Sequence, residues 1–246
     1  MPNPNFLPLR EIRPSGWIET FLKTQAAGLT GHPSIHGYPF GQKFWGSPND
    51  DTGPYAAWWP YAVFLRAVIA QYEITGDARY LNALVRHYQS APHPMDWDRD
   101  VAGVEALVYL YQQTNDSAFL ERAKDLYNRF NTKFPKHDCS LETLNSGKKI
   151  TLHGVSFNEI ADLAAILYSA TAKEEYRQAV INEYAKVDRD QLLADGMHSC
   201  SEDLRGRDPL DSHETCDITD HTWALTYLLQ MTRDGKYADR IEKIIE

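Results

Sequence analysis

The segment 72–80, which reads YEITGDARY, contains the pattern that decides the fold, because it recurs three more times along the chain. The other copies are YQQTNDSAF at 111–119, YSATAKEEY at 168–176 and LQMTRDGKY at 229–237. Each copy begins with a large apolar or aromatic residue, has threonine three positions later, and ends with an aromatic residue five positions after the threonine. Three of the four copies also have aspartate two positions after the threonine.

We interpret each copy as the turn of a helical hairpin. The first residue closes one helix on its buried face, and Gly76 or Asn115 tolerates the left-handed conformation that ends a helix. The aspartate then caps the next helix through its carboxylate, and the aromatic residue packs the first turn of that helix against its partner. Because Lys173 replaces the aspartate in the third copy and cannot cap in this way, we expect a looser turn there.

The segments beside these turns have apolar residues at helical spacing, namely 56–72, 80–88, 104–111, 160–168 and 223–229. Strand-like alternation is nearly absent, so the sequence predicts eight or nine helices. The copies are unequally spaced, unlike the fixed period of a tetratricopeptide array, which indicates hairpins joined by long, variable loops. We therefore predict an all-α fold, an (α/α) toroid of helical hairpins that forms one domain over residues 1–246.

Composition restricts the class of protein. A hydrophobic fraction of 43% with 24% charged residues is typical of a globular chain, and no apolar run approaches the length of a membrane span. The first residues have neither a basic nor an apolar leader region, which favours a cytoplasmic location, or a periplasmic or secreted one if a leader was removed. The net charge of −9 argues against a nucleic-acid partner. Three cysteines are too few for a disulfide framework, and we expect them to be reduced.

Two long stretches, 28–60 and 188–217, interrupt the helical pattern, and ordered loops of this length are usually functional. The first is rich in aromatic residues, including Trp58 and Trp59. Sugars bind to aromatic platforms beside polar groups, so both tryptophans are candidates for substrate binding. The alternative is that they pack in the core, as most aromatic residues do.

The second stretch holds Glu214 and Cys216, which are two residues apart and can face one point. A thiolate beside a carboxylate suits Zn²⁺ and does not suit Mg²⁺ or Ca²⁺. The alternative is a helix N-terminus at which Thr215 or Asp217 caps and Cys216 packs.

Glu202 and Glu214 also form a candidate carboxylate pair for cleavage of a glycosidic bond, which needs a protonated acid at the leaving oxygen. Two loop glutamates can equally be solvated. His153 and Gly154 precede an apolar helix, so the imidazole either points into a cavity or satisfies the start of that helix.

Four pieces of sequence resemble the β-L-arabinofuranosidase group, which is glycoside hydrolase family 127 (GH127) and its relatives, the former DUF1680. They are HGVSFNE at 153–159, the segment from Asp195 to Pro209 with Glu202, HETC at 213–216 and YADRIE at 237–242. The similarity runs in order from about Gly16 to the end of the chain.

The resemblance implies an (α/α)₆ barrel, incomplete in this chain, and a retaining mechanism at a zinc-bound cysteine thiolate acting on plant-type glycans. It implies that Glu202 is the general acid/base, that Glu214 and Cys216 are zinc ligands, and that His153 contacts an oligosaccharide or glycoside substrate. The group has an adjacent cysteine pair further downstream, which this sequence lacks. The resemblance thus implies the N-terminal part of a longer catalytic domain, completed by a C-terminal part, or association into a homo-oligomer.

Two other functions are compatible with the same residues. One is a non-catalytic carbohydrate-binding or assembly domain of the toroid fold. The other is a metal-independent toroid enzyme, such as a uronyl hydrolase or a sugar epimerase, that uses carboxylates or histidine without zinc.

Overall fold

The computed structural model describes residues 9–28, 58–90, 98–136, 139–208 and 213–245. In residues 58–64 and 98–99 it describes the backbone but not the side chains. These residues form two compact units, one within 5–94 and one within 95–246. The single domain that we expected over residues 1–246 therefore stays a prediction. Among the described residues, no helix combines the length and the apolar character that crossing a membrane requires.

Helices account for nearly all regular structure. The first unit contains η1 (Leu9–Glu11), α1 (Gly16–Ala27), α2 (Trp58–Thr75) and α3 (Ala78–Ser90). The second contains η3 (Asp98–Ala102), α4 (Gly103–Thr114), α5 (Ser117–Lys133), α6 (Leu141–Asn145), α7 (Gly154–Ala161), α8 (Leu163–Thr171), α9 (Glu174–Gln191), α10 (Thr215–Thr232) and α11 (Lys236–Ile245). Two short antiparallel strands, β1 (Cys200–Ser201) and β2 (Asp203–Leu204), pair within the loop before α10.

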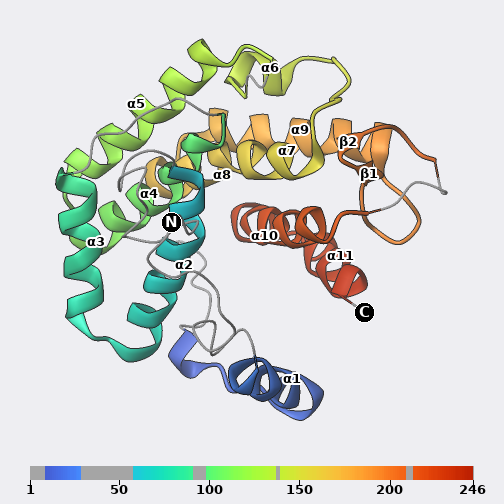
Figure 1. Cartoon of the computed structure of the whole chain (residues 1–246). Helices are drawn as coiled ribbons and strands as arrows, with labels where there is room; N and C mark the ends of the chain where they lie inside the picture. Colours follow the sequence, from blue (N-terminus) through green and yellow to red (C-terminus); the bar gives the residue numbers. More distant parts are fainter. Residues whose placement is uncertain (1–8, 29–57, 91–97, 137–138, 209–212, 246) are drawn as a thin grey trace. The chain divides into compact units, whose positions relative to one another are not determined.

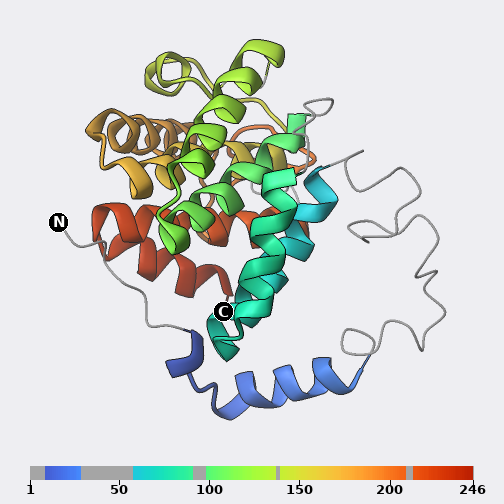
Figure 2. The same cartoon turned by 90° about the vertical axis from the view of Figure 1, so that its left-hand side faces the viewer.

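All four repeat copies form the predicted turns, which join α2 to α3, α4 to α5, α8 to α9 and α10 to α11 (Figures 1 and 2). The residue after each threonine is left-handed, with φ of 67° at Gly76, 57° at Asn115, 53° at Ala172 and 58° at Arg233. In every copy its backbone N–H donates to the carbonyl four residues earlier at 2.8 Å. This bond ends the first helix of each hairpin.

The threonine in the pattern has a double role that the sequence interpretation missed. In each copy its hydroxyl donates to the carbonyl four residues earlier, at 2.6 Å for Thr75 and 2.7 Å for Thr114, Thr171 and Thr232. The same oxygen accepts the backbone N–H two residues later, at 3.2 to 3.4 Å. Threonine therefore bonds groups on both sides of the turn, which explains why it is the most regular feature of the repeat.

The aspartates of the repeat cap the second helix of each hairpin as predicted, and the lysine of the third copy alters its turn less than we expected. Asp116 accepts the backbone N–H of Ala118 at 3.0 Å, and Asp77 and Asp234 make the equivalent bonds. Lys173 makes no such cap bond. Ala172 keeps the same left-handed conformation and the same 2.8 Å bond as the other copies. The turn differs in the missing cap bond and in the distance from the Lys173 N–H to the Thr171 hydroxyl, which is 3.4 Å here and 3.2 Å in the other copies.

Other details of the helix pattern also differ from the prediction. The helix expected over 160–168 is two helices, α7 and α8, divided at Asp162. Within the described ranges the helices outnumber the eight or nine predicted, because of this division and because the sequence interpretation gave neither α1 nor α6. The all-α fold of helical hairpins is confirmed.

The core of the second unit surrounds α8. This helix packs against α4, α5, α7, α9 and α10. Its residues from Leu163 to Leu167 are all buried, which is expected of a helix that is apolar on every side. The neighbouring helix α7 is buried in the same way and leads back to His153.

We expect Asp116→Ala to lower the free energy of unfolding by about 1 kcal/mol, because the cap bond to Ala118 is lost. Lys173→Ala occupies the same turn position without a cap bond and should change stability much less. Chemical denaturation of both variants checks this, and equal losses would contradict the assigned role of the aspartate.

Candidate functional site

Two helix N-termini meet at the candidate site. His153 is the N-cap residue of α7 and Glu214 is the N-cap residue of α10, and the two helices pack against each other. The backbone N–H groups at a helix N-terminus carry a positive partial charge, which stabilises nearby carboxylates. The packing of α7 on α10 therefore creates a position that favours acidic groups.

Three predicted site residues come together there. The Nε2 atom of His153 lies 3.2 Å from Glu214 Oε2 and 3.4 Å from Glu202 Oε2. One possible metal-ligand atom from each residue lies within 4.8 Å of those of the other two. Among the described residues, no other three His, Cys, Asp or Glu side chains come this close together. The Glu202 side chain is 74% exposed, whereas those of His153 and Glu214 are 22% and 24% exposed. The site thus has two half-buried members and one that reaches into solvent.

The first turn of α7 orients the His153 ring. Its Nδ1 atom accepts the backbone N–H of Ser156 and lies 3.4 Å from that residue's hydroxyl oxygen. This contact turns Nε2 toward the two glutamates. The interpretation that His153 satisfies the start of the helix is confirmed, and the ring also faces the two acidic groups.

Glu202 has an unusual backbone conformation. It lies at the turn between β1 and β2 with φ of 85°, a region that residues other than glycine rarely adopt. Its carbonyl accepts the backbone N–H of Gly154 at 2.8 Å and the thiol of Cys200 at 3.2 Å. These bonds hold a conformation that costs about 1 kcal/mol or more, and such strain is often found at functional sites.

Glu214 is fixed by backbone contacts. Its N–H donates to the carbonyl of Cys200 at 3.2 Å, which ties the start of α10 to β1. Its Oε2 atom is buried and accepts no hydrogen bond within the described part of the chain, although it lies beside His153. A buried carboxylate oxygen of this kind is suited to a cation or a donor group.

Cys216 is exposed, and its sulfur is not one of the atoms that meet at His153. Burial raises the pKa of its thiol, and the charge of Glu214 raises that pKa further, which disfavours the thiolate. The assignment of Cys216 as a metal ligand therefore stays a prediction. The side chains of Trp58 and Trp59 lie outside the described residues, so their assignment to substrate binding also stays a prediction.

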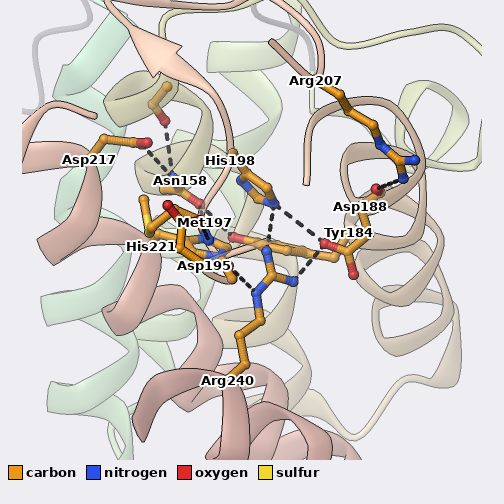
Figure 3. A network of polar contacts seen from close by, with 12 residues as sticks. Asn158, Tyr184, Asp188, Asp195, Met197, His198, Arg207, Asp217, His221 and Arg240 are labelled. Carbon is orange, nitrogen blue, oxygen red and sulfur yellow. Dashed lines mark hydrogen bonds and ion pairs between the residues drawn. The ribbon is translucent and has the colours of Figure 1, made fainter. Parts of the chain in front are cut away.

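Behind the site lies a buried polar network that the sequence interpretation missed (Figure 3). Asn158, on α7, is its centre and is fully buried. Its amide donates to Asp217 Oδ1 at 2.8 Å, and its carbonyl oxygen accepts from the Tyr184 hydroxyl at 3.2 Å and contacts His221 Nδ1 at 3.0 Å. The network thereby connects α7 with α9 and α10 immediately beneath His153 and Glu214.

Burial shifts the ionisation of this network. It raises the pKa of Asp217 to about 6, with bonds from Asn158 and Cys200 acting in the opposite direction. It lowers the pKa of His198 to about 4 and that of His221 well below its ordinary value. Both histidines are therefore neutral at neutral pH, and their rings lie with centroids 4.2 Å apart.

An ion pair anchors the loop that leads to the site (Figure 3). Arg240, on α11, bonds Asp188 at 2.6 Å and the carbonyl of Gly196 at 2.7 Å, and it lies 2.9 Å from His198 Nε2. His213, next to Glu214, in turn contacts the carbonyl of His198 at 3.1 Å. A chain of contacts thus runs from α11 to the residue before Glu214.

Two residues of the network belong to the motifs that carry the family resemblance. Asn158 belongs to HGVSFNE, and Arg240 belongs to YADRIE. The signal in the sequence was a polar residue within a helix that is otherwise apolar on that face. The helical spacing alone could not show which of these polar residues contact one another.

We expect Gly154→Ala to destabilise the protein by about 1 to 3 kcal/mol, as overpacking does. A Cβ at this position would clash with the Cys200 sulfur and lie 2.8 Å from Asp217 Oδ1. Gly147→Ala is the matched control, because a Cβ there meets nothing within 4 Å. Thermal or chemical unfolding checks the difference, and two equally stable variants would contradict the close packing.

The buried histidines predict a pH dependence of stability. Since their pKa values are lowered in the folded state, the unfolded state binds more protons between pH 6.5 and about 4. Stability is then lost as the pH falls through this window, by up to about 1.4 kcal/mol per pH unit for each group. Asp217 acts in the opposite direction, because its raised pKa favours folding at lower pH.

We expect His198→Gln, which retains a polar side chain beside Arg240, to reduce the loss of stability on acidification. Unfolding measured at several pH values in the wild type and the variant checks this. An unchanged slope would show that His198 does not contribute to the dependence.

No family model matches this sequence, and no curated protein matches it significantly. Solved structures do match. A GH127 beta-arabinofuranosidase aligns with a TM-score of 0.65 and 16% identity over 94% of this chain and 41% of that structure. The GH127 beta-L-arabinofuranosidase from Geobacillus stearothermophilus T6 aligns with a TM-score of 0.61 and 16% identity over 96% of this chain and 44% of that structure. A polysaccharide lyase aligns with a TM-score of 0.51 and 13% identity over 76% of this chain and 58% of that structure.

These similarities agree with the resemblance found in the sequence, and at this level of identity they establish the fold. The chain spans about two fifths of the length of the GH127 structures. It therefore has the all-α helical-toroid fold of the GH127 enzymes, over a part of their length.

Proposed function

We propose that this chain contributes an acid/base glutamate and part of a metal site to a glycoside hydrolase that resembles the β-L-arabinofuranosidases. The observation that carries the proposal is the convergence of His153, Glu202 and Glu214 at two helix N-termini. The similarity to GH127 structures supports a glycoside hydrolase-like function and a glycan substrate. Because the chain spans only part of those structures, the activity and its substrate are proposals.

Glu202 is the acid/base in this proposal. Its side chain is the most exposed of the three and reaches toward solvent, where a glycoside would enter. A general acid must protonate the leaving sugar oxygen within hydrogen-bond distance, and the exposed carboxyl group of Glu202 would be accessible to that oxygen. His153, held between the two glutamates, would orient Glu202 and contact the hydroxyl groups of the sugar.

The retaining mechanism remains part of the proposal and is implied only by the sequence resemblance. In that mechanism the nucleophile is a zinc-bound cysteine and Glu214 is a metal ligand. The distance between Glu202 and Glu214, whose ligand oxygens lie within 4.8 Å of each other, therefore does not decide between retention and inversion.

The residues fit a divalent metal in part. One imidazole nitrogen and two carboxylate oxygens are ligands that Zn²⁺ accepts, and Glu214 Oε2 is buried without a hydrogen bond. In this proposal Glu214 holds the metal with Cys216, as the sequence resemblance implies, or with His153, as the geometry favours. Zinc would supply Lewis acidity and keep a bound cysteine in the thiolate form.

A metal-independent toroid enzyme is the second candidate. The alignment with a polysaccharide lyase shows that a related fold also occurs in a protein named for another class of reaction, which motivates this candidate. Turnover that persists in a strong chelator would support this candidate. Binding of an oligosaccharide without turnover would instead support the carbohydrate-binding or assembly domain.

Removing the proposed acid/base tests the reaction. We expect Glu202→Gln to lower kcat on an aryl β-L-arabinofuranoside by about 10²-fold or more, since general acid catalysis contributes at least that much. Glu142→Gln, on α6 outside the site, is the control and should retain full activity. Equal activity of both variants would contradict the role of Glu202.

Zinc binding distinguishes the two ligand sets. Calorimetric titration should show binding that Glu214→Ala abolishes, because both sets include this residue. Loss of affinity in Cys216→Ser identifies the thiol as a ligand, and loss in His153→Ala identifies the imidazole. Glu142→Ala is the control, and zinc affinity that is unaffected by all three site variants would contradict the metal site.

A further inference from the structure

A pocket lies in the larger unit, and its lining includes none of His153, Glu202 and Glu214. It has a volume of about 200 Å³ and is bounded by α6, α7, α9 and the segment 148–152. Its apolar wall includes Leu144, Ile150, Phe157 and Ile160, all of which are buried. Ligand pockets for drug-sized molecules are about 300 Å³ or larger, so this pocket is suited to a smaller molecule.

The pocket concentrates positive charge in an acidic protein. Lys136, Lys148 and Lys149 line it, and all three are exposed. The only acidic residue among the described lining residues is Glu183, whereas the whole chain has a net charge of −9. Lys136, Lys148 and Lys149 favour an anion near this pocket, and the Lys149 ammonium also acts on the carboxylate of Asp190.

The interior of the pocket presents polar groups to a ligand. The Ser146 hydroxyl oxygen is buried and has no hydrogen-bond partner among the described residues. The Glu183 side chain is 4% exposed and pairs with Lys186 at 2.7 Å. Burial raises the pKa of Glu183, and Lys186 acts against this shift. The Ser146 hydroxyl requires a partner that a hydroxyl group of a ligand could supply. The Glu183 carboxylate already pairs with Lys186, and its oxygens can accept further hydrogen bonds.

We propose that this pocket binds a small polyhydroxylated carboxylate of the size of a single uronic acid. The lysines hold its carboxylate at the opening, Ser146 and Glu183 bond its hydroxyl groups, and the apolar wall covers its carbon skeleton. Charge-assisted bonds to lysine supply most of the affinity. The volume excludes an oligosaccharide, which distinguishes this pocket from the proposed catalytic site.

Binding of three probes tests each part of the assignment. We expect D-glucuronate to bind saturably in titrations followed by protein NMR, with shifts in residues 143–151. D-glucose lacks the carboxylate and propionate lacks the hydroxyl groups, so each should bind at least ten-fold more weakly than glucuronate.

Variants locate the binding to the pocket. Lys148→Gln/Lys149→Gln and Ser146→Ala should each weaken glucuronate binding at least five-fold. Lys23→Gln/Lys124→Gln removes the same charge at positions outside the pocket and should leave binding unchanged. Thr151→Trp places a large side chain at the exposed edge of the pocket and should block binding while the far-UV circular dichroism stays that of the folded protein.

Three results would overturn the proposal. They are the absence of saturable glucuronate binding, equal affinity for glucose or propionate, and affinity that the pocket variants do not change. The catalytic proposal is tested separately, because Glu202→Gln should leave glucuronate binding here intact.

Discussion

Close packing at Gly154 sets the distance between α7 and α10, and that distance brings the site together. The absence of a side chain lets the first turn of α7 lie against Cys200 and Asp217, with no space for a Cβ. The Gly154 N–H also holds the carbonyl of Glu202. Consequently His153, one residue earlier, meets both glutamates at two helix N-termini, whose partial positive charge stabilises the carboxylates.

The buried network maintains this packing. Asn158 uses its amide and its carbonyl oxygen to connect Asp217, Tyr184 and His221, and Arg240 holds the loop that precedes Glu214. Buried polar groups of this kind are costly unless they are paired, so the network permits few alternative arrangements. The site is thus supported by specific hydrogen bonds, whereas α8 supports the unit as a whole through apolar packing.

The pocket lined by Lys136, Lys148 and Lys149 differs in its chemistry from the candidate site. It shares α7 with the candidate site but is lined by different residues and has the opposite charge character. A pocket lined by lysines is suited to an anion, whereas paired glutamates are suited to a cation or to the hydroxyl groups of a sugar. On electrostatic grounds the two places would favour different ligands.

The sequence alone determined the hairpins, because the left-handed residue, the threonine and the capping aspartate act within a few residues of one another. It also indicated His153, Glu202 and Glu214 through their residue types and their motifs. Only the tertiary structure decided that these three meet, that Cys216 lies outside their group, and that Asn158 and Arg240 support them. The reason is physical: turn chemistry is local in sequence, whereas the site depends on contacts between helices far apart in the chain.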